Sequence, residues 1–322
     1  MRTAPSARAA LLFAFAFSVL WAGLELMVTR LHGGYDVLQI EGCRFAVQLA
    51  LMLALWGWRR DAMRQPLWRT RRPLLQLLRA ALMLAIPLGF GVAVLQGASP
   101  HLVLTGLWVA PVFALLLARG WLQSRAPLGL WIAAAAGLCA TVAMLEPARP
   151  PSLQAALVPL LMGLAFALYL ALTRSLRHEP VQTNLFYVAL GGVLGVAPFL
   201  PGVWVAPSLH DALVFAALGV FGFLALWLLE HALRRWALPW VAPALYLHVA
   251  CLTAVSLLAR GHLPSLRIAF GLMMVVAIAY ALWRAALAHD RHELPQRAPV
   301  LTGPMALEPA TGPVPLDDDP RL

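Results

Sequence analysis

The sequence predicts an all-α membrane protein with ten transmembrane helices in two inverted five-helix repeats. Three observations lead to this prediction. Apolar runs fill most of the 322 residues, one nine-residue stretch occurs twice, and arginines are unevenly distributed among the connecting segments. The apolar runs indicate membrane insertion, the repeated stretch indicates an internal duplication, and the arginines indicate the orientation in the membrane.

The composition excludes a soluble globular domain. Hydrophobic residues make up 61% of the chain and charged residues 12%, with a mean hydropathy of +0.78, whereas a soluble domain is usually about one quarter charged. The net charge of +10 does not indicate nucleic-acid binding, because all 24 basic residues are arginines that mostly separate apolar runs. Cys43, Cys139 and Cys251 lie inside apolar runs without metal-ligand or disulfide spacing. We therefore expect a lipid bilayer as the surroundings, and neither cofactor, metal nor nucleic acid as a partner.

The repeated stretch indicates an internal duplication. Residues 116–124 (LLARGWLQS) return 141 residues later as 257–265 (LLARGHLPS), with seven of nine positions identical. Residues 26–30 (LMVTR) are echoed by 170–174 (LALTR). Two helix ends built alike, each an apolar run closed by arginine and glycine, are the alternative explanation.

The duplication predicts two repeats, at residues 1–146 and 150–285, followed by a disordered cytoplasmic tail at 286–322. Each repeat contains five apolar runs of about the length that spans a bilayer. The predicted spans are Ala9–Thr29, Val37–Trp58, Leu74–Gln96, His101–Ala118, Leu128–Leu145, Ala156–Thr173, Thr183–Leu200, Leu213–Ala232, Trp240–Ala259 and Leu266–Trp283. Met1–Gly23 could alternatively be a signal peptide, but its apolar run continues to Thr29.

Arginine distribution sets the orientation. The segment between the second and third predicted spans holds six arginines, at positions 59, 60, 64, 69, 71 and 72. Placing it in the cytoplasm puts most other arginines there too, and leaves Arg30, Arg149, Arg260 and Arg267 outside. We therefore expect a multi-pass membrane protein with both termini cytoplasmic. Five spans per repeat make the second repeat inverted, as in many secondary transporters.

Two predicted spans carry helix-breaking residues at corresponding places. Pro87 and Gly89 lie midway along the third span, and Gly219 and Gly222 midway along the eighth. Interruptions there would indicate a midplane cavity between the repeats. Close helix packing through small residues is the alternative.

Ionisable residues inside spans are candidates for substrate or coupling sites, because their burial is unfavourable. Glu25 and Arg44 lie at similar depths in the first two spans, so we expect them to pair. Glu41, three residues before Arg44, is the alternative partner. The pair could bind a substrate charge, couple transport to protons, or be purely structural.

Other polar residues are weaker candidates. His248 and Tyr246 lie in the ninth span, and Gln96, Trp108 and His101 in or beside the third and fourth spans. A core histidine held by hydrogen bonds is the alternative role for His248. Two further expectations are structural: Arg79 extends to the cytoplasmic interface, and Glu230 pairs with Arg234 at i, i+4.

The chain lacks enzyme motifs: it has no Walker loop, no GxGxxG opening a helix, no HExxH and no GxSxG. We therefore expect no enzymatic activity. A membrane-embedded lipid-handling enzyme and a non-transporting scaffold remain the alternatives to a transporter.

Short motifs over both halves resemble the drug/metabolite transporter superfamily, EamA type. The matching residues are Trp21-Ala22-Gly23, Arg44, Pro111, Phe166-Ala167-Leu168-Tyr169 and Ala232-Leu233-Arg234-Arg235. The resemblance implies a secondary transporter, often an exporter, that moves a small metabolite, amino acid or drug-like compound across the cell's inner (plasma) membrane. The chain departs from the family at Gly120-Trp121 and Gly261-His262, where Gly-Glu is usual, and at His248-Val249, where Glu-Pro is usual.

Overall fold

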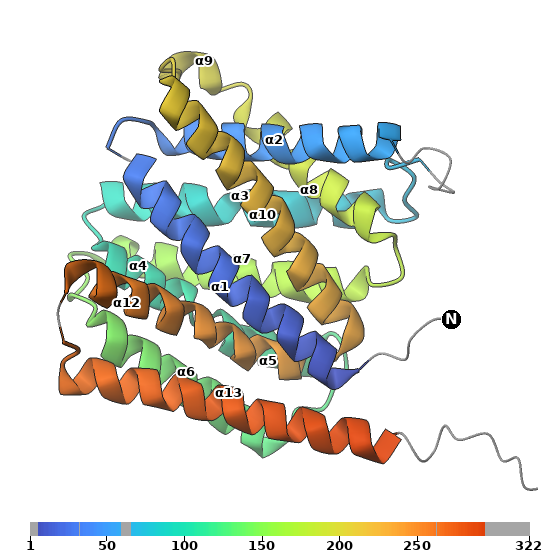
Figure 1. Cartoon of the computed structure of the whole chain (residues 1–322), viewed down its shortest axis with the longest axis vertical. Helices are drawn as coiled ribbons and strands as arrows, with labels where there is room; N and C mark the ends of the chain where they lie inside the picture. Colours follow the sequence, from blue (N-terminus) through green and yellow to red (C-terminus); the bar gives the residue numbers. More distant parts are fainter. Residues whose placement is uncertain (1–5, 32, 59–65, 262, 294–322) are drawn as a thin grey trace, which may run out of the picture.

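The computed structural model describes residues 6–31, 33–58, 66–261 and 263–293, and every regular element in them is a helix (Figure 1). Nine of the described helices are long and apolar enough to cross a membrane. They are α1 (Ala7–Leu31), α2 (Val37–Trp58), α3 (Pro73–Leu95), α4 with α5 (Pro100–Leu107, Ala110–Gly120), α6 (Leu128–Leu145), α7 (Leu153–Ser175), α10 (Leu209–Arg235), α11 with η1 and α12 (Leu238–Val241, Ala242–Tyr246, Leu247–Arg260) and α13 (Leu266–Glu293). The chain is therefore an all-α, multi-pass membrane protein.

A shorter apolar helix, α8 (Val181–Val196), occupies most of the predicted seventh span. It is followed by a single turn, α9 (Leu200–Val203). At 16 residues α8 is shorter than the other membrane-length helices. Pro198 lies two residues beyond its end, where it lacks the backbone N–H that a continuing helix would need.

The bundle has two ends that differ in charge. We call one the arginine-rich end: it holds the start of α1, the end of α13 and the α2–α3, α5–α6, α7–α8 and α10–α11 connections. The opposite end holds the α1–α2, α3–α4, α6–α7, α9–α10 and α12–α13 connections. There the side chain of Gln39 exchanges two hydrogen bonds with the backbone of Val205, at 2.6 and 2.9 Å. Figure 1 shows the arginine-rich end on the right and α9, at the opposite end, on the upper left.

The first part of the predicted disordered tail is helical. Residues 286–293 were expected to be disordered, but α13 continues to Glu293. Asp290 explains the continuation, since it accepts hydrogen bonds from Ser6 Oγ at 2.7 Å, Ala7 N at 2.8 Å and Arg8 Nε at 2.8 Å. It thereby caps the N-terminus of α1, where a negative charge is favourable. Residues 294–322 lie outside the described part.

The expected interruptions in the third and eighth spans are absent from the structure. α3 is continuous through Pro87 and Gly89, and α10 is continuous through Gly219 and Gly222. These glycines instead permit close contact: a Cβ on Gly89 would lie 2.6 Å from Met162, and one on Gly219 would lie 2.4 Å from Val47. The close-packing alternative therefore describes these glycines.

The breaks lie in the fourth and ninth apolar segments. α4 ends at Leu107 and α5 begins at Ala110, one residue before Pro111. The ninth segment passes through a 3₁₀ helix, Ala242–Tyr246, that contains Pro243. Proline has no backbone N–H, so one helical hydrogen bond is missing at each of these breaks.

The two halves of the chain interlock rather than pack as separate bodies. α1 packs along α10, α3 along α7 and α8, α2 along α8 and α10, and α6 along α13. In Figure 1, α1 and α10 run side by side diagonally across the front of the bundle. Residues of both halves consequently share the main hydrophobic core.

Candidate functional site

A cavity of about 180 Å³ lies inside the bundle, nearer the opposite end. Its walls come from α1, α2, α3 and α4 of the first half and from α7 and α12 of the second. The lining is mostly apolar, and the charged side chains in it are Glu25, Glu41 and Arg44. Pro87, which lies inside α3, also contributes to the wall. An apolar cavity with a few converging polar groups is the usual form of a small-molecule site.

Arg44 pairs with Glu41 rather than with Glu25. Arg44 Nη2 lies 2.6 Å from Glu41 Oε2, and both side chains are buried. The guanidinium also lies over the Trp21 and Phe45 rings, at 5.8 and 4.6 Å from their centroids. The expected partnership with Glu25 is therefore wrong and the alternative is correct, because a partner one turn away on the same helix is always in reach.

Glu25 pairs with His248 instead. Glu25 Oε2 lies 3.3 Å from His248 Nε2, and the glutamate side chain is 22% exposed whereas the histidine is fully buried. Glu25 thus faces the cavity while its partner lies behind it. The contact joins α1 to α12, and so joins the two halves of the chain.

Aromatic rings surround the buried histidine. Trp108 stacks on His248 with ring centroids 4.8 Å apart, and Tyr246 lies 6.3 Å from Trp108. Trp108 Nε1, Tyr246 Oη and His248 Nδ1 are buried without a hydrogen-bond partner among the described residues. The structure therefore brings together four of the predicted polar candidates, Glu25, Trp108, Tyr246 and His248. The helix break after α4 places Trp108 in this cluster.

Gln96 lies outside this cluster, at the C-terminal cap of α3. His101 lines a second cavity of about 140 Å³ together with Thr253, Ser256 and Arg260. That cavity shares Leu104 and Leu252 with the first one. The two cavities thus adjoin, and the second extends toward the opposite end.

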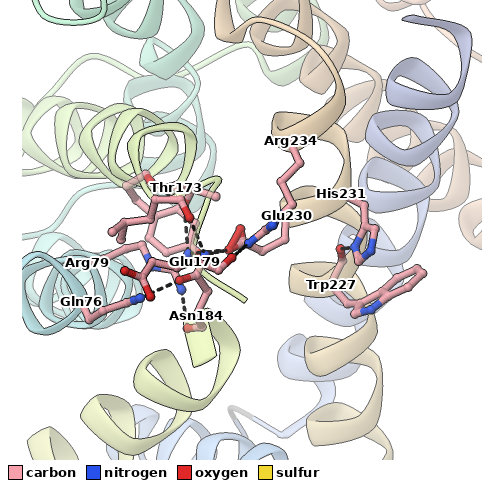
Figure 2. A network of polar contacts seen from close by, with 11 residues as sticks. Gln76, Arg79, Thr173, Glu179, Asn184, Trp227, Glu230, His231 and Arg234 are labelled. Carbon is pink, nitrogen blue, oxygen red and sulfur yellow. Dashed lines mark hydrogen bonds and ion pairs between the residues drawn. The ribbon is translucent and has the colours of Figure 1, made fainter. Parts of the chain in front are cut away.

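A buried polar network that was not predicted from the sequence lies near the arginine-rich end (Figure 2). Arg79 is fully buried, and its Nη1 lies 3.2 Å from Glu230 Oε1 and donates to Thr173 Oγ1 at 3.2 Å. Asn184 donates its side-chain amide to Glu230 and accepts from Gln76 Nε2 at 2.6 Å. The network ties α3 of the first half to α7, α8 and α10 of the second.

Two expectations are therefore wrong. Arg79 does not extend to the interface, because it is enclosed by α7, α8 and α10 and donates to the Asn184 carbonyl and to Glu230. Glu230 pairs with Arg79 and not with Arg234, whose guanidinium donates to the Glu179 carbonyl. One signal in the sequence could have revealed the pair. Arg79 lies about a turn and a half after the start of α3, and Glu230 lies about a turn and a half before the end of α10. Both of these helix termini are at the arginine-rich end, so the two opposite charges lie at similar depth.

Comparisons with known proteins establish the fold alone. No protein-family model and no curated protein match the chain. A solved structure described as "Crystal structure of protein" superposes with a TM-score of 0.73 over 86% of this chain and 98% of its own, at 20% sequence identity. The helical arrangement is thus one that an experimentally determined protein adopts along nearly its whole length.

Proposed function

We propose that the protein is a secondary transporter of the drug/metabolite type that moves a small molecule across the inner membrane. The proposal includes ten spans in two inverted repeats, with α8 as the shortest span. It rests above all on one observation, a cavity that both halves line and that holds buried charged groups.

The positions of the connections support ten crossings. Residues just before α8 contact the α2–α3 connection at the arginine-rich end, where Arg71 N donates to Glu179 Oε1 at 3.2 Å. Residues after α9 contact Gln39 at the opposite end. A chain that changes ends between these contacts must cross the bundle through α8. Both ends of the described chain then lie at the arginine-rich end, which the positive-inside rule assigns to the cytoplasm.

The packing pattern supports inverted repeats. Suppose that α1, α2, α3 and α6 correspond to α7, α8, α10 and α13. Exchanging the two halves then turns the α1–α10 contact into α7–α3 and the α2–α10 contact into α8–α3, and all four of these contacts occur. The α2–α8 and α6–α13 contacts, which also occur, are unchanged by the exchange. Such exchange is what a two-fold axis between the halves produces. The repeated stretch fits as well: Trp121 lines a cleft at the arginine-rich end, and Arg260 lines the cavity at the opposite end.

The cavity favours a small substrate with an apolar body and an amino or other cationic group. Arg44 is already neutralised by Glu41 at 2.6 Å, whereas Glu25 is partly exposed to the cavity. A substrate cation and His248 would then compete for the same carboxylate. Competition between a proton held at His248–Glu25 and a substrate charge is a means of coupling transport to a proton gradient.

The experiment begins with an untargeted metabolite comparison between a deletion strain and its parent. Compounds that differ are then tested for transport by purified protein in liposomes. We expect Glu25→Gln to reduce transport at least tenfold, on the order of one charge-assisted contact, while Glu146→Gln, a carboxylate at the opposite end outside the cavity, leaves it unchanged. No differing compound, or equal rates for the two variants, would refute the proposal.

A further inference from the structure

The arginine-rich end contains a cleft formed by two adjoining hollows of about 560 and 500 Å³. They share Arg72, Ser175 and His178 in their linings. The cleft lies between the α2–α3 and α7–α8 connections and extends to the α5–α6 connection at Trp121. It is far larger than the internal cavity and is lined by different residues.

The cleft is strongly positive. Five arginines line it, Arg69, Arg71, Arg72, Arg174 and Arg177, and Glu179 is the acidic residue in its lining. The guanidinium groups of residues 69, 71 and 72 have no hydrogen-bond or ion-pair partner among the described residues. Converging guanidinium groups present several donors at fixed angles, which suits a phosphate group.

Two helices begin at this cleft with uncapped N-termini. α3 starts after Arg72 and α8 after Pro180, and neither N-cap residue accepts a hydrogen bond through its side chain. At the opposite end α4, α7 and α10 are each capped by a serine hydroxyl, from Ser99, Ser152 and Ser208. The free N–H groups of α3 and α8 therefore add to the positive field of the arginines.

The surface beside the cleft is apolar. Leu74, Leu77 and Leu78 follow Arg72 on α3 and are exposed, with Leu74 79% accessible. Trp121, which lines the cleft, and Trp68, which precedes Arg69 in the sequence, are also exposed. Tryptophans at this level are typical of the membrane interface. A ligand that fills both surfaces must combine an anionic head with acyl chains.

We propose that this cleft binds the phosphate headgroup of an anionic phospholipid, with the acyl chains lying along the exposed leucines of α3. Basic pockets between helix ends on the cytoplasmic side recognise such headgroups. A positive-inside bias alone requires only that arginines be numerous at this end. It does not require five of them to line one cleft at which the N-termini of α3 and α8 lack side-chain caps.

The test is native mass spectrometry of the purified full-length protein in detergent, with phosphatidylglycerol, phosphatidylethanolamine or inorganic phosphate added. The cleft variant is Arg71→Gln/Arg72→Gln. The matched control, Arg284→Gln/Arg291→Gln, removes the same charge from exposed positions on α13, outside the cleft lining. We expect the cleft variant to weaken phosphatidylglycerol binding about tenfold or more, because each arginine near the surface contributes on the order of 1 kcal/mol. The control should retain wild-type binding.

Three results would overturn the proposal: equal loss in both variants, equal retention of phosphatidylethanolamine and phosphatidylglycerol, or displacement of the lipid by millimolar inorganic phosphate. The last result would identify a site for free phosphate instead. A second measurement tests the proposal even if the double cleft variant folds poorly. Phosphatidylglycerol should raise the Tm of the wild type and of the control but not that of the single variant Arg72→Gln. None of these measurements depends on transport, so the lipid site and the transport function can fail separately.

Discussion

Replacing Arg79 with methionine tests whether the buried ion pair holds the two halves of the bundle together. Arg79 and Glu230 have fully buried side chains with a nitrogen–oxygen distance of 3.2 Å. The substitution removes the cation and leaves Glu230 with the Asn184 amide as its remaining described partner. Breaking a buried pair on one side destabilises a protein by about 3–5 kcal/mol, because the remaining charge is uncompensated.

The assay heats the purified protein in mixed micelles to a series of temperatures. Size-exclusion chromatography then measures how much protein remains folded after each temperature. Arg8→Met is the matched control, since Arg8 pairs with Asp290 at 2.8 Å at the same end but is about half exposed. An exposed ion pair contributes roughly 0–1 kcal/mol to the free energy of unfolding. The Arg8→Met control should therefore unfold at a temperature close to that of the wild type.

A double variant separates the pair from its surroundings. Arg79→Met/Glu230→Leu removes both charges, and we expect it to be more stable than either single variant, because no buried charge is left unpaired. If Arg79→Met unfolds no more easily than Arg8→Met, or if the two single effects simply add, the ion pair does not hold the halves together.

Three further predictions concern other parts of the structure. Cysteines introduced at His178 and Val205, in a chain without its native cysteines, should react with a membrane-impermeant reagent from opposite sides of the membrane; labelling from one side would show that α8 does not cross. Gly137→Ala should destabilise the protein by about 1–3 kcal/mol, since a Cβ there would lie 2.1 Å from the buried Tyr246 ring, and thermal unfolding near wild type would contradict that packing. His248→Phe keeps a ring against Trp108 but removes the group that pairs with Glu25, so we expect transport driven by a proton gradient to be lost; unchanged proton-driven transport would exclude His248 as the coupling residue.

The sequence predicted helix positions well because span length and apolar content are local properties. The predicted span Leu128–Leu145 and α6 have the same bounds, and the predicted second span and α2 are both Val37–Trp58. The extent of α8 was harder to predict, since its apolar run continues past Val196, where the helix ends just before Pro198. The position of a break is likewise set by packing: α3 accommodates Pro87, whereas the chain breaks near Pro111 and Pro243.

The candidate site was predicted in part. Glu25, Trp108, Tyr246 and His248 were identified because polar residues inside apolar runs are conspicuous, and the structure gathers them. Their partners could not be predicted, because partners come from helices more than a hundred residues apart in sequence. The same limit applies to Arg79 and Glu230, each of which has a plausible local role that the fold does not use.

The sequence by itself determined that this protein is helical, lies in a membrane and has an arginine-rich end, because these properties follow from composition and from the order of apolar runs. Only the tertiary structure decided which charges pair, which helices bend and where the cavity and the cleft lie. The physical reason is that a buried charge is stabilised by whichever opposite charge or dipole the packed helices bring within about 3 Å. That distance depends on how helices from the two halves pack together, which no local stretch of the chain encodes.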